Sequence, residues 1–357
     1  MKRLLIVTDA WTPQTNGVVT TLTAVIPHLP ALGFEVEVLH PGRFATVPLP
    51  SYPEIRVVRE LWKVARFIRG AAPDTVHIAT EGPLGLAARH WLCRRGMRFT
   101  TSLHTKFPEY VRDRVGLPLA VGYGFLRWFH RPSAAVLCTT DSHRSELEGW
   151  GLRHLVVWGR GVDTVHFRPA TRAPRLRPQL LYVGRVAVEK NVEAFLTLPL
   201  DADKVVVGDG PARALLERRH PEACWLGFRH GDALAAAYAD ADVLVFPSRT
   251  DTFGLVMLEA MACGTPVAAF PVTGPRDVVV PGVTGALDVD LPVAVQRALV
   301  IDRQRCRDHA LTQDWRQVAE RLAVVLCPIE QPAAEGLAAG SRGHADVHRL
   351  PGPGALT

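Results

Sequence analysis

The chain has 357 residues, of which 48% are hydrophobic and 21% charged, and its formal net charge is +6 at pH 7. Single hydrophobic cores stop growing at roughly 250 residues, so this length favours two domains. The apolar content excludes a wholly disordered protein, and no apolar stretch reaches the roughly 20 residues that a membrane-spanning helix needs. We therefore expect two globular domains and no spanning helix.

The positive charge is concentrated in the N-terminal half. Residues 1–165 contain 20 Lys and Arg against 13 Asp and Glu, whereas the rest of the chain contains 21 against 22. This asymmetry indicates that the first half meets an anionic partner, and lipid headgroups, a phosphorylated acceptor and nucleic acid all fit it.

The cysteines and the N-terminus indicate a cytoplasmic protein. The six cysteines form no Cys-x-x-Cys pair and have no histidine at metal-ligand spacing, so we expect neither disulfides nor a zinc site. The first apolar run, residues 4–7, is too short for a signal peptide and predicts a buried strand.

Short runs rich in Val, Ile and Leu alternate with helical patterns, which is typical of buried parallel strands. A first series lies at 4–7, 35–39, 75–78, 99–102, 135–139 and 155–157. A second series lies at 180–183, 204–207, 224–226, 243–246 and 266–269. The fold class is therefore predicted to be α/β, with two doubly wound domains and a ligand cleft between them.

The domain organisation follows from these series. We expect an N-terminal domain at 1–166, a linker rich in proline and arginine at 167–179, and a C-terminal domain at 180–311. A crossover helix is expected at 312–327. Residues 328–357 are rich in Pro, Gly and Ala without periodicity, which predicts a disordered tail.

The strongest functional pattern carries two acids, Asp251 and Glu259, directly after a predicted strand. A helix that starts near Phe253 or Gly254 points its free N–H groups at the carboxyl edge of the sheet, where phosphate binds readily. Gly254 lets the backbone approach a ligand, and Glu259 lies within reach of a ribose diol. The alternative is a capped helix with Asp251 near its N-cap and Glu259 on a solvated face.

Two cations, Arg185 and Lys190, lie in the loop after the first strand of the second series. Arg can form two parallel hydrogen bonds to phosphate oxygens, and Lys supplies a point charge. The pair therefore suits the stabilisation of a leaving diphosphate without a metal ion. Ordinary surface charges are the alternative. At the next strand end, Gly208 and Gly210 form a turn against which a planar base would lie. This turn lacks the complete Gly-x-Gly-x-x-Gly pattern, which disfavours a dehydrogenase.

In the first domain, residues 12–19 form a small polar loop that ends at a helix N-terminus. Gly17 in this loop is placed to offer its N–H to the same diphosphate from across the cleft, although an ordinary strand-to-helix turn explains the pattern equally well. His104 follows the strand at 99–102, again at the ligand edge of the sheet. A lone histidine is usually structural, but this position favours a functional one.

With these residues together, the chain resembles glycosyltransferase family 4, the retaining nucleotide-sugar transferases of GT-B fold, from residue 1 to about 326. Its most specific part is 251–259, where most of the family shows Glu-x-Phe-Gly-x-x-x-x-Glu and this sequence begins with Asp, one methylene shorter. Other matching stretches are 80–85, 104–110, 160–163 and 274–278. The subset it most resembles includes GDP-mannose-dependent α-mannosyltransferases and the sulfoquinovosyl and glycosyl transferases of diacylglycerol lipids.

The resemblance implies roles in the second domain. Asp251 and the amides of Phe253, Gly254 and Leu255 would hold hydroxyls of the donor sugar, and Glu259 would hold the ribose. The family's retention of configuration is explained by same-face attack, in which the leaving phosphate oxygen deprotonates the acceptor.

It also implies roles at the diphosphate. Arg185 and Lys190 would bind it, Gly17 would touch it from the other domain, and His104 would contact the sugar near the reacting carbon. The residues predicted as catalytic are His104, Asp251, Arg185 and Lys190. The predicted donor site contains Gly17, Arg185, Lys190, Gly208, Gly210, Phe253, Gly254, Leu255 and Glu259.

No metal or cofactor is predicted beyond the donor. Asp-x-Asp triplets occur at 201–203, 240–242 and 288–290, but they do not resemble the metal-binding loop of the other transferase fold.

The segment 54–70 is interpreted as a helix with a basic flank. This flank contains Arg59, Lys63, Arg66 and Arg69, beside the apolar residues Leu61, Trp62, Val64, Phe67 and Ile68. Such a pattern is typical of a helix that lies on an anionic membrane surface. A solvated helix that covers a core is equally compatible with it.

The sequence therefore predicts a cytoplasmic retaining hexosyltransferase with access to the inner face of the cell membrane. GDP-mannose is favoured as donor, a lipid or glycan hydroxyl as acceptor, and no nucleic-acid partner is expected. The first alternative is a UDP-sugar-dependent glucosyl or sulfoquinovosyl transferase that acts on diacylglycerol. The others are a non-catalytic module that binds nucleotide sugar, and a sugar-nucleotide epimerase, which the paired acids disfavour.

Overall fold

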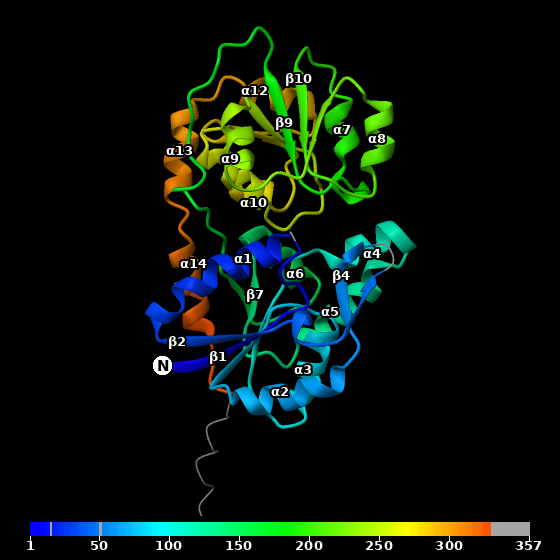
Figure 1. The fold of residues 1–357 in the computed structure, drawn as a ribbon, viewed down its shortest axis with the longest axis vertical. Coiled ribbons are helices and arrows are strands. Elements are labelled where there is room, and N and C mark those ends of the chain that lie inside the picture. Colours follow the sequence, from blue (N-terminus) through cyan, green and yellow to red (C-terminus); the bar gives the residue numbers. More distant parts are fainter. Residues whose placement is uncertain (15, 50–51, 330–357) are drawn as a thin grey trace, which may run out of the picture.

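The protein has two α/β halves (Figure 1), and its computed structural model describes residues 1–14, 16–49 and 52–329. Each half contains a six-stranded sheet, with strand orders β2-β1-β5-β6-β7-β8 and β11-β10-β9-β12-β13-β14. Neighbouring strands in both sheets are parallel, which requires crossover connections, and helices supply them. The predicted α/β class with two doubly wound units is confirmed.

The N-terminal half is built from the first eight strands and six helices. Its sheet contains β1 (Lys2–Val7), β2 (Phe34–Leu39), β5 (Thr75–Ile78), β6 (Thr100–Ser102), β7 (Val136–Cys138) and β8 (Leu155–Val157). Its helices are α1 (Gly17–Val25), α2 (Val64–Ala71), α3 (Pro83–Cys93), α4 (Phe107–Val115), α5 (Leu119–His130) and α6 (Asp141–Gly149). Short 3₁₀ turns are η1 (Ile26–His28), η2 (Pro30–Leu32), η3 (Pro41–Arg43) and η4 (Leu61–Lys63).

The C-terminal half repeats this plan. Its sheet contains β9 (Gln179–Val183), β10 (Asp203–Val207), β11 (Cys224–Gly227), β12 (Val243–Phe246), β13 (Val267–Ala269) and β14 (Gly285–Leu287). Its helices are α7 (Val192–Leu196), α8 (Arg213–Arg219), α9 (Gly231–Asp240), α10 (Leu255–Ala262), α11 (Pro275–Val278), α12 (Leu291–Ala298) and α13 (Arg303–Leu311), with the 3₁₀ turn η5 (Val188–Lys190).

Strand β1 shows why a continuous apolar run becomes a central strand. Leu4 and Ile6 point into one core, which also contains residues of α1, whereas Leu5 and Val7 point into a second core with residues of α2 and α3. Both faces of the sheet are covered, so neither face needs polar side chains.

The last helix, α14 (Trp315–Val325), returns to the N-terminal half (Figure 1). Its residues Trp315, Val318 and Leu322 join the core that contains Leu4 and Ile6. The second half is therefore tied to the first by apolar packing as well as by the connecting chain.

The interpretation of 54–70 as one helix is wrong for its first residues. β3 (Thr46–Leu49) and β4 (Tyr52–Val58) form a separate two-stranded antiparallel hairpin. Val57 and Val58 are β-branched and suit a strand, and Val58 is buried in the core. The helical part starts only at η4 and continues as α2.

The apolar face of α2 covers the protein core, one of the two alternatives that the sequence left open. Val64 and Ile68 are each 1% exposed and pack in the core beneath the sheet. The four basic side chains of the predicted flank are all exposed: Arg59, Lys63, Arg66 and Arg69. Trp62 is also exposed, at 73%.

Within 1–14, 16–49 and 52–329, no helix is both long enough and apolar enough to cross a bilayer. The predicted disordered tail lies outside the described residues from position 330 onward.

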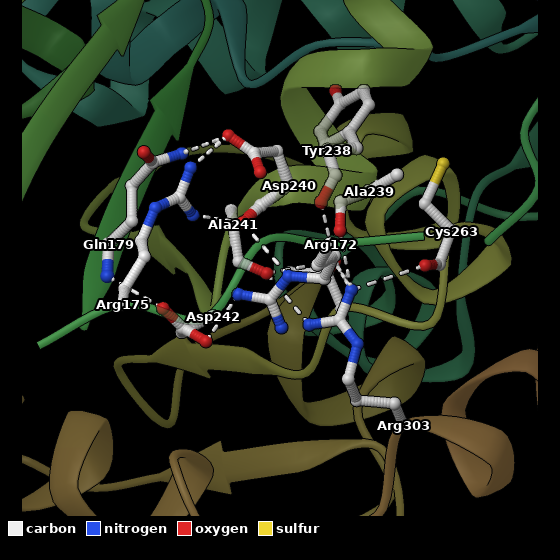
Figure 2. A network of polar contacts seen from close by, with 11 residues as sticks. Arg172, Arg175, Gln179, Tyr238, Ala239, Asp240, Ala241, Asp242, Cys263 and Arg303 are labelled. Carbon is white, nitrogen blue, oxygen red and sulfur yellow. Dashed lines mark hydrogen bonds and ion pairs between the residues drawn. The ribbon is translucent and has the colours of Figure 1, made fainter. Parts of the chain in front are cut away.

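The predicted linker is held firmly against the C-terminal half (Figure 2). Arg172 forms an ion pair with Asp242, and Arg175 forms one with Asp240. These carboxylates belong to the triplet at 240–242, so both are already neutralised by arginines. Arg303 of α13 donates to the carbonyl oxygens of Ala239 and Ala241 at 2.8 and 2.7 Å. The guanidinium groups thus satisfy backbone acceptors where α9 ends.

The other two triplets are paired in the same way. Asp201 lies 2.7 Å from Arg177, and Asp288 lies 2.9 Å from Arg297.

Arg303 provides a test of this anchoring. Replacement by methionine keeps the aliphatic stem but leaves buried carbonyl oxygens without their donor, which costs about 1–3 kcal/mol. We expect Arg303→Met to lower the free energy of unfolding by about 2 kcal/mol in urea titrations. Arg305→Met on the exposed side of the same helix is the matched control. An equal loss in both variants would contradict the anchoring role.

Candidate functional site

The loop that carries Asp251 lies between the two halves. Thr139, after β7, donates its hydroxyl to the carbonyl oxygen of Thr252 at 2.9 Å. The hydroxyl of Thr252 donates to the carbonyl oxygen of His104 at 2.6 Å. Both threonines are buried, so these bonds form away from water, where an unpaired polar group is costly. The N-terminal half therefore fixes the position of the Asp251 loop.

Asp251 and Lys190 form an ion pair at this interface. The ammonium of Lys190 donates to Oδ1 of Asp251, and both side chains are mostly buried. Burial opposes the charged form of Lys190, but the attraction of Asp251 outweighs it and raises the pKa of the ammonium above its ordinary value. Lys190 therefore stays charged.

The other oxygen of this carboxylate, Oδ2 of Asp251, is buried and has no hydrogen-bond partner among the described residues. Buried carboxylate oxygens normally accept hydrogen bonds, because the loss of hydration is otherwise uncompensated. A ligand hydroxyl is one group that can satisfy this oxygen.

Arg185 lies in the same loop as Lys190. One of its guanidinium nitrogens lies 2.7 Å from the carboxylate of Glu189, and its carbonyl oxygen accepts from the hydroxyl of Tyr182 at 2.8 Å. The structure thus brings Arg185, Lys190 and Asp251 together, as predicted from the sequence, and adds Glu189 to them.

Tyr110 reaches this cluster from α4 of the N-terminal half. Burial raises the pKa of its phenol, and Lys190, Asp251, Arg185 and Glu189 all contribute to the field around it. A neutral phenol can both donate and accept a hydrogen bond. Tyr110 is not one of the site residues predicted from the sequence, although it lies in the stretch 104–110 that resembles the family.

The glycines after β10 are needed for packing inside the protein, in addition to the contact with a base that the sequence predicts. A Cβ atom on Gly208 would lie 1.8 Å from the carbonyl oxygen of Gly184, and one on Gly210 would lie 2.4 Å from that of Val186. Gly208 also has a φ of 139°, which other residues rarely adopt. These glycines allow the Arg185 loop to pack against the β10 loop, so they support the cation-bearing loop from behind.

Gly254 is required by the protein interior in a similar way. It is the N-cap of α10, with a φ of 85°, and a Cβ atom there would lie 2.8 Å from the ring of Phe246. Asp251 therefore does not cap this helix, and that alternative is wrong. Phe253 beside it packs against the core of the C-terminal half.

Two helix N-termini meet at the interface. α1 begins at Gly17, and α10 begins at Leu255, whose side chain packs against the core of the N-terminal half. A Cβ atom on Gly17 would lie 3.9 Å from Leu255. The positive ends of both helix dipoles therefore lie together at the interface, and α10 begins shortly after Asp251, the partner of Lys190. Such an arrangement suits a diphosphate.

Glu259 lies on α10 and accepts a hydrogen bond from the hydroxyl of Tyr238 at 2.7 Å. Burial raises the pKa of this carboxyl group. The alternative that placed Glu259 on a solvated face is therefore wrong, because the side chain is largely enclosed and held by a tyrosine.

His104 is enclosed by hydrogen bonds within the protein. The guanidinium of Arg160 donates to Nδ1 at 2.9 Å, so the ring proton lies on Nε2, which is 2.8 Å from the hydroxyl of Ser102. Burial and the charge of Arg160 lower the pKa of the imidazole well below its ordinary value, and the ring is neutral. A hydrogen bond from His104 to a donor sugar, as the resemblance implied, requires that Arg160 or Ser102 release a nitrogen.

Two family models match the chain. The model described as Glycosyltransferase Family 4 matches residues 15–166, and the model described as Glycosyl transferases group 1 matches residues 177–300.

The chain is also similar to characterised proteins over most of its length. It is 32% identical to a GDP-mannose-dependent alpha-mannosyltransferase of Mycobacterium tuberculosis, over 90% of this chain and 95% of that protein. It is 30% identical to the sulfoquinovosyl transferase SQD2 of Arabidopsis thaliana, over 78% of this chain and 60% of that protein.

Solved structures show the same fold. Sucrose-phosphate synthase from Thermosynechococcus elongatus superposes with a TM-score of 0.73 at 20% identity, and the match covers 91% of this chain and 98% of that chain. Anabaena HepE in complex with UDP-glucose superposes with a TM-score of 0.66 at 16% identity, over 91% of this chain and 99% of that chain. The two facing α/β units, the matches to both family models and the similarity along almost the whole chain agree: the chain belongs to glycosyltransferase family 4 and has the GT-B fold.

Proposed function

We propose that the protein is a retaining hexosyltransferase that moves mannose from GDP-mannose onto a hydroxyl group of a lipid or glycan. The observation that carries this proposal is the buried Asp251 carboxylate at the interface, with one oxygen on Lys190 and the other without a partner. Such an oxygen is suited to accept a hydrogen bond from a hydroxyl of the donor sugar. The relatives named as GDP-mannose-dependent enzymes support the choice of donor.

In the proposed reaction, the diphosphate lies at Arg185, Lys190 and the N-termini of α1 and α10. These groups stabilise the charge that develops on the leaving phosphate, so no metal ion or other cofactor is required. Gly17 contributes its backbone from the N-terminal half. Glu259 binds the ribose. The hydrogen bond from Tyr238 holds the Glu259 carboxylate in position for this contact.

No side chain is proposed as a nucleophile. The acceptor hydroxyl attacks the sugar on the face from which the diphosphate leaves, and the departing phosphate oxygen takes its proton, which retains the configuration. The amides from Phe253 to Leu255 and the side chain of Asp251 fix the sugar, so the protein contributes position and charge.

A UDP-sugar donor with a diacylglycerol acceptor is the second candidate. Similarity to the sulfoquinovosyl transferase SQD2 favours it. In either proposal the base lies against the turn at Gly208 and Gly210, whose missing side chains also make room for the neighbouring loop.

Nucleotide binding distinguishes the two donors. A ligand that binds only the folded protein stabilises it by about 2.7 kcal/mol at one hundred times its Kd. We expect GDP at 1 mM to raise the Tm by several degrees and UDP at the same concentration to raise it less. A larger rise in Tm with UDP would contradict GDP-mannose as the donor and favour a UDP-sugar.

Asp251 distinguishes a working enzyme from a module that only binds nucleotide sugar. Asp251→Asn keeps the size of the side chain but removes its charge, and we expect it to lower kcat for GDP release at least a hundredfold. Asp251→Glu restores the acid that is commoner in the family and is expected to retain activity. Asp141→Asn, at an exposed position on α6, is the control. Absence of GDP release from the wild type and from Asp251→Glu with membrane lipid extract would favour the binding module.

We further propose that the protein is cytoplasmic and associates with the inner face of the cell membrane. The exposed side chains in and just before α2 include Arg59, Lys63, Arg66, Arg69 and Trp62, and Lys63 is paired with Glu60. In this proposal they act together as one basic and aromatic surface. Basic residues near an anionic surface each contribute about 1 kcal/mol to its binding.

Vesicle sedimentation tests this association. Wild-type protein is expected to sediment with phosphatidylglycerol vesicles and to remain in the supernatant with phosphatidylcholine vesicles. Charge reversal at Lys63 and Arg66 is expected to abolish sedimentation, whereas reversal at the distant Arg153 is not. Equal sedimentation of the two charge-reversal variants would contradict the proposal that α2 binds the membrane.

A further inference from the structure

Arg160 is a buried cation that the proposed donor site does not use. It lies after β8, on the segment that leads out of the N-terminal half, and it is 5% exposed. Burial lowers the pKa of its guanidinium to about 9, so the group is charged at neutral pH. Within 1–14, 16–49 and 52–329, no carboxylate pairs with it. A buried charge without a partner of opposite charge is costly, so the position of Arg160 has to be explained by its other contacts.

The guanidinium of Arg160 contacts its own neighbours in the chain and His104. One of its nitrogens donates to the carbonyl oxygen of Gly159 at 2.6 Å, and its central carbon lies 4.8 Å from the ring centre of Trp158. A second nitrogen donates to Nδ1 of His104 at 2.9 Å. The first two contacts lie within two residues of Arg160 along the chain, so the bond to His104 is the one that joins the guanidinium to a distant segment.

The backbone around Arg160 is fixed where the chain passes between the two halves. The N–H of Val162 donates to the carbonyl oxygen of Gln313 at 3.0 Å, just before α14. A Cβ atom on Gly161 would lie 2.5 Å from the backbone nitrogen of Trp315, so this segment packs closely against the start of α14. The guanidinium therefore reaches the site from a firmly anchored segment.

The ring of His104 is held by Arg160 and Trp158, and its backbone is held by the loop that carries Asp251. The ring centres of His104 and Trp158 are 5.6 Å apart, with an interplanar angle of 75°, which is an edge-to-face contact. The carbonyl oxygen of His104 accepts from the hydroxyl of Thr252, which directly follows Asp251. His104 therefore lies close to the residue proposed to hold the donor sugar.

Ser102 is the partner that His104 can release. Its hydroxyl oxygen lies 2.8 Å from Nε2 of His104. The same oxygen lies 3.2 Å from Nε2 of His77 and 3.4 Å from the carbonyl oxygen of Ala79. A hydroxyl group donates one hydrogen bond and accepts two. It can therefore donate to Ala79 and accept from His77 when the N–H of His104 turns to a ligand.

Arg160 is the partner that His104 keeps. A hydrogen bond from a charged donor is roughly twice as strong as one between neutral groups. Loss of the bond to Nδ1 would also take an acceptor from the buried guanidinium, and a buried donor without an acceptor is costly. Release of Ser102 therefore costs less than release of Arg160, and Nε2–H is the group that can reach a ligand.

Two further histidines surround the same ring. His77 on β5 and His143 on α6 each have a pKa of about 3, because burial disfavours their charged forms, so both are neutral near pH 7. Lys106 acts on His143 and is itself paired with Glu146. Arg160 is thus the cation that acts directly on the ring.

The charge of Arg160 keeps His104 neutral. Burial and this charge lower the pKa of the imidazole well below its ordinary value. The reacting carbon of a sugar develops positive charge during glycosyl transfer, so a neutral imidazole beside it is favoured over a charged one. Without Arg160 the pKa of His104 would rise toward its ordinary value of about 6.5, and the ring would become charged as the pH falls through that range.

From these contacts we infer that Arg160 is a positioning residue for the sugar transfer: it holds the ring of His104 with its proton on Nε2 and directs this N–H to a hydroxyl group of the donor sugar. The inference rests on the proposed hexosyl transfer. It gives a role to a buried arginine that is not among the site residues predicted from the sequence, and it decides which ring nitrogen meets the substrate.

Kinetics of two variants test this role. Arg160→Met keeps the aliphatic stem but removes the donors and the charge, whereas Arg160→Lys keeps a cation with N–H donors. The reaction followed is nucleotide release from GDP-mannose, or from UDP-glucose if the wild-type protein consumes that donor, with membrane lipid extract. We expect kcat to fall about tenfold in Arg160→Met and about threefold in Arg160→Lys near neutral pH, while the KM for the donor changes less than about threefold.

The pH profile separates positioning from a loss of stability. In Arg160→Met, kcat/KM is expected to fall below about pH 6.5, as His104 becomes charged, and the wild-type protein lacks this step. Arg303→Met is the control. It removes a guanidinium from the C-terminal half and lowers the stability, but it is expected to keep the wild-type pH profile.

Two further measurements show whether Arg160 acts through His104. Arg160→Met is expected to lower kcat in the wild-type background but not in His104→Gln, so the two effects are not additive. Nitrogen-15 NMR of the full-length protein without ligand needs no activity. We expect His104 to carry its proton on Nε2 in the wild type and to show a mixture of both tautomers in Arg160→Met, with His104→Gln to assign the signals.

The inference is overturned if Arg160→Met keeps the wild-type kcat and pH profile, if it lowers kcat equally in the His104→Gln background, or if His104 carries its proton on Nδ1 in the wild type. If Arg160→Met does not fold, the wild-type tautomer and the kcat of Arg160→Lys carry the test. Failure of the proposed function has a different readout: the wild-type protein then gains no thermal stability from GDP or UDP and consumes no donor with any acceptor or with water.

Discussion

The ion pair between Lys190 and Asp251 is the interaction on which the candidate site depends. It joins the loop after β9 to the loop after β12, and it pairs a carboxylate with an ammonium group in a mostly buried place. One oxygen of this carboxylate is satisfied and the other is not. A buried, unpartnered oxygen is unfavourable for folding alone, so a hydroxyl group that donates to Oδ2 of Asp251 would stabilise this position.

The surrounding packing explains why this position is held so closely. Thr139 and the carbonyl of His104 fix Thr252 from the N-terminal half, while the glycines after β10 allow the Lys190 loop to pack from behind. On the far side of the C-terminal half, Arg303 satisfies the backbone at the end of α9. Loops with functional side chains are thus presented by rigid elements, which reduces the cost of ordering them when a ligand binds.

Much of the framework could be predicted from the sequence because buried parallel strands are continuous apolar runs. The runs at 75–78, 155–157 and 243–246 coincide with β5, β8 and β12. The hairpin and β14 were not predicted. β3 and β14 have only four and three residues, too few to show a period, and most of β4 lies in the segment that was interpreted as a helix. The grouping of Arg185, Lys190 and Asp251 was predictable because parallel strands end at one edge of a sheet.

What the sequence could not supply are the contacts made between distant segments. The hydrogen bond from the hydroxyl of Thr252 to the backbone carbonyl oxygen of His104 joins residues 148 positions apart, and no sequence pattern at either position identifies the partner. The enclosed state of His104 likewise depends on Arg160, which approaches from another loop. Gly208 looked like a ligand contact because glycine permits any close approach, and only the structure shows that the approaching group is the carbonyl of Gly184.

The shortened acid at position 251 is consistent with this arrangement. A glutamate would extend the carboxylate by one C–C bond, about 1.5 Å. The aspartate instead keeps one oxygen on Lys190 while the other stays inside the interface. An ammonium group has three N–H donors, so Lys190 can hold Asp251 and also donate to a phosphate. One oxygen of Asp251 thus holds a cation and the other can accept from a ligand. This arrangement favours an active transferase over a module that only binds nucleotide sugar.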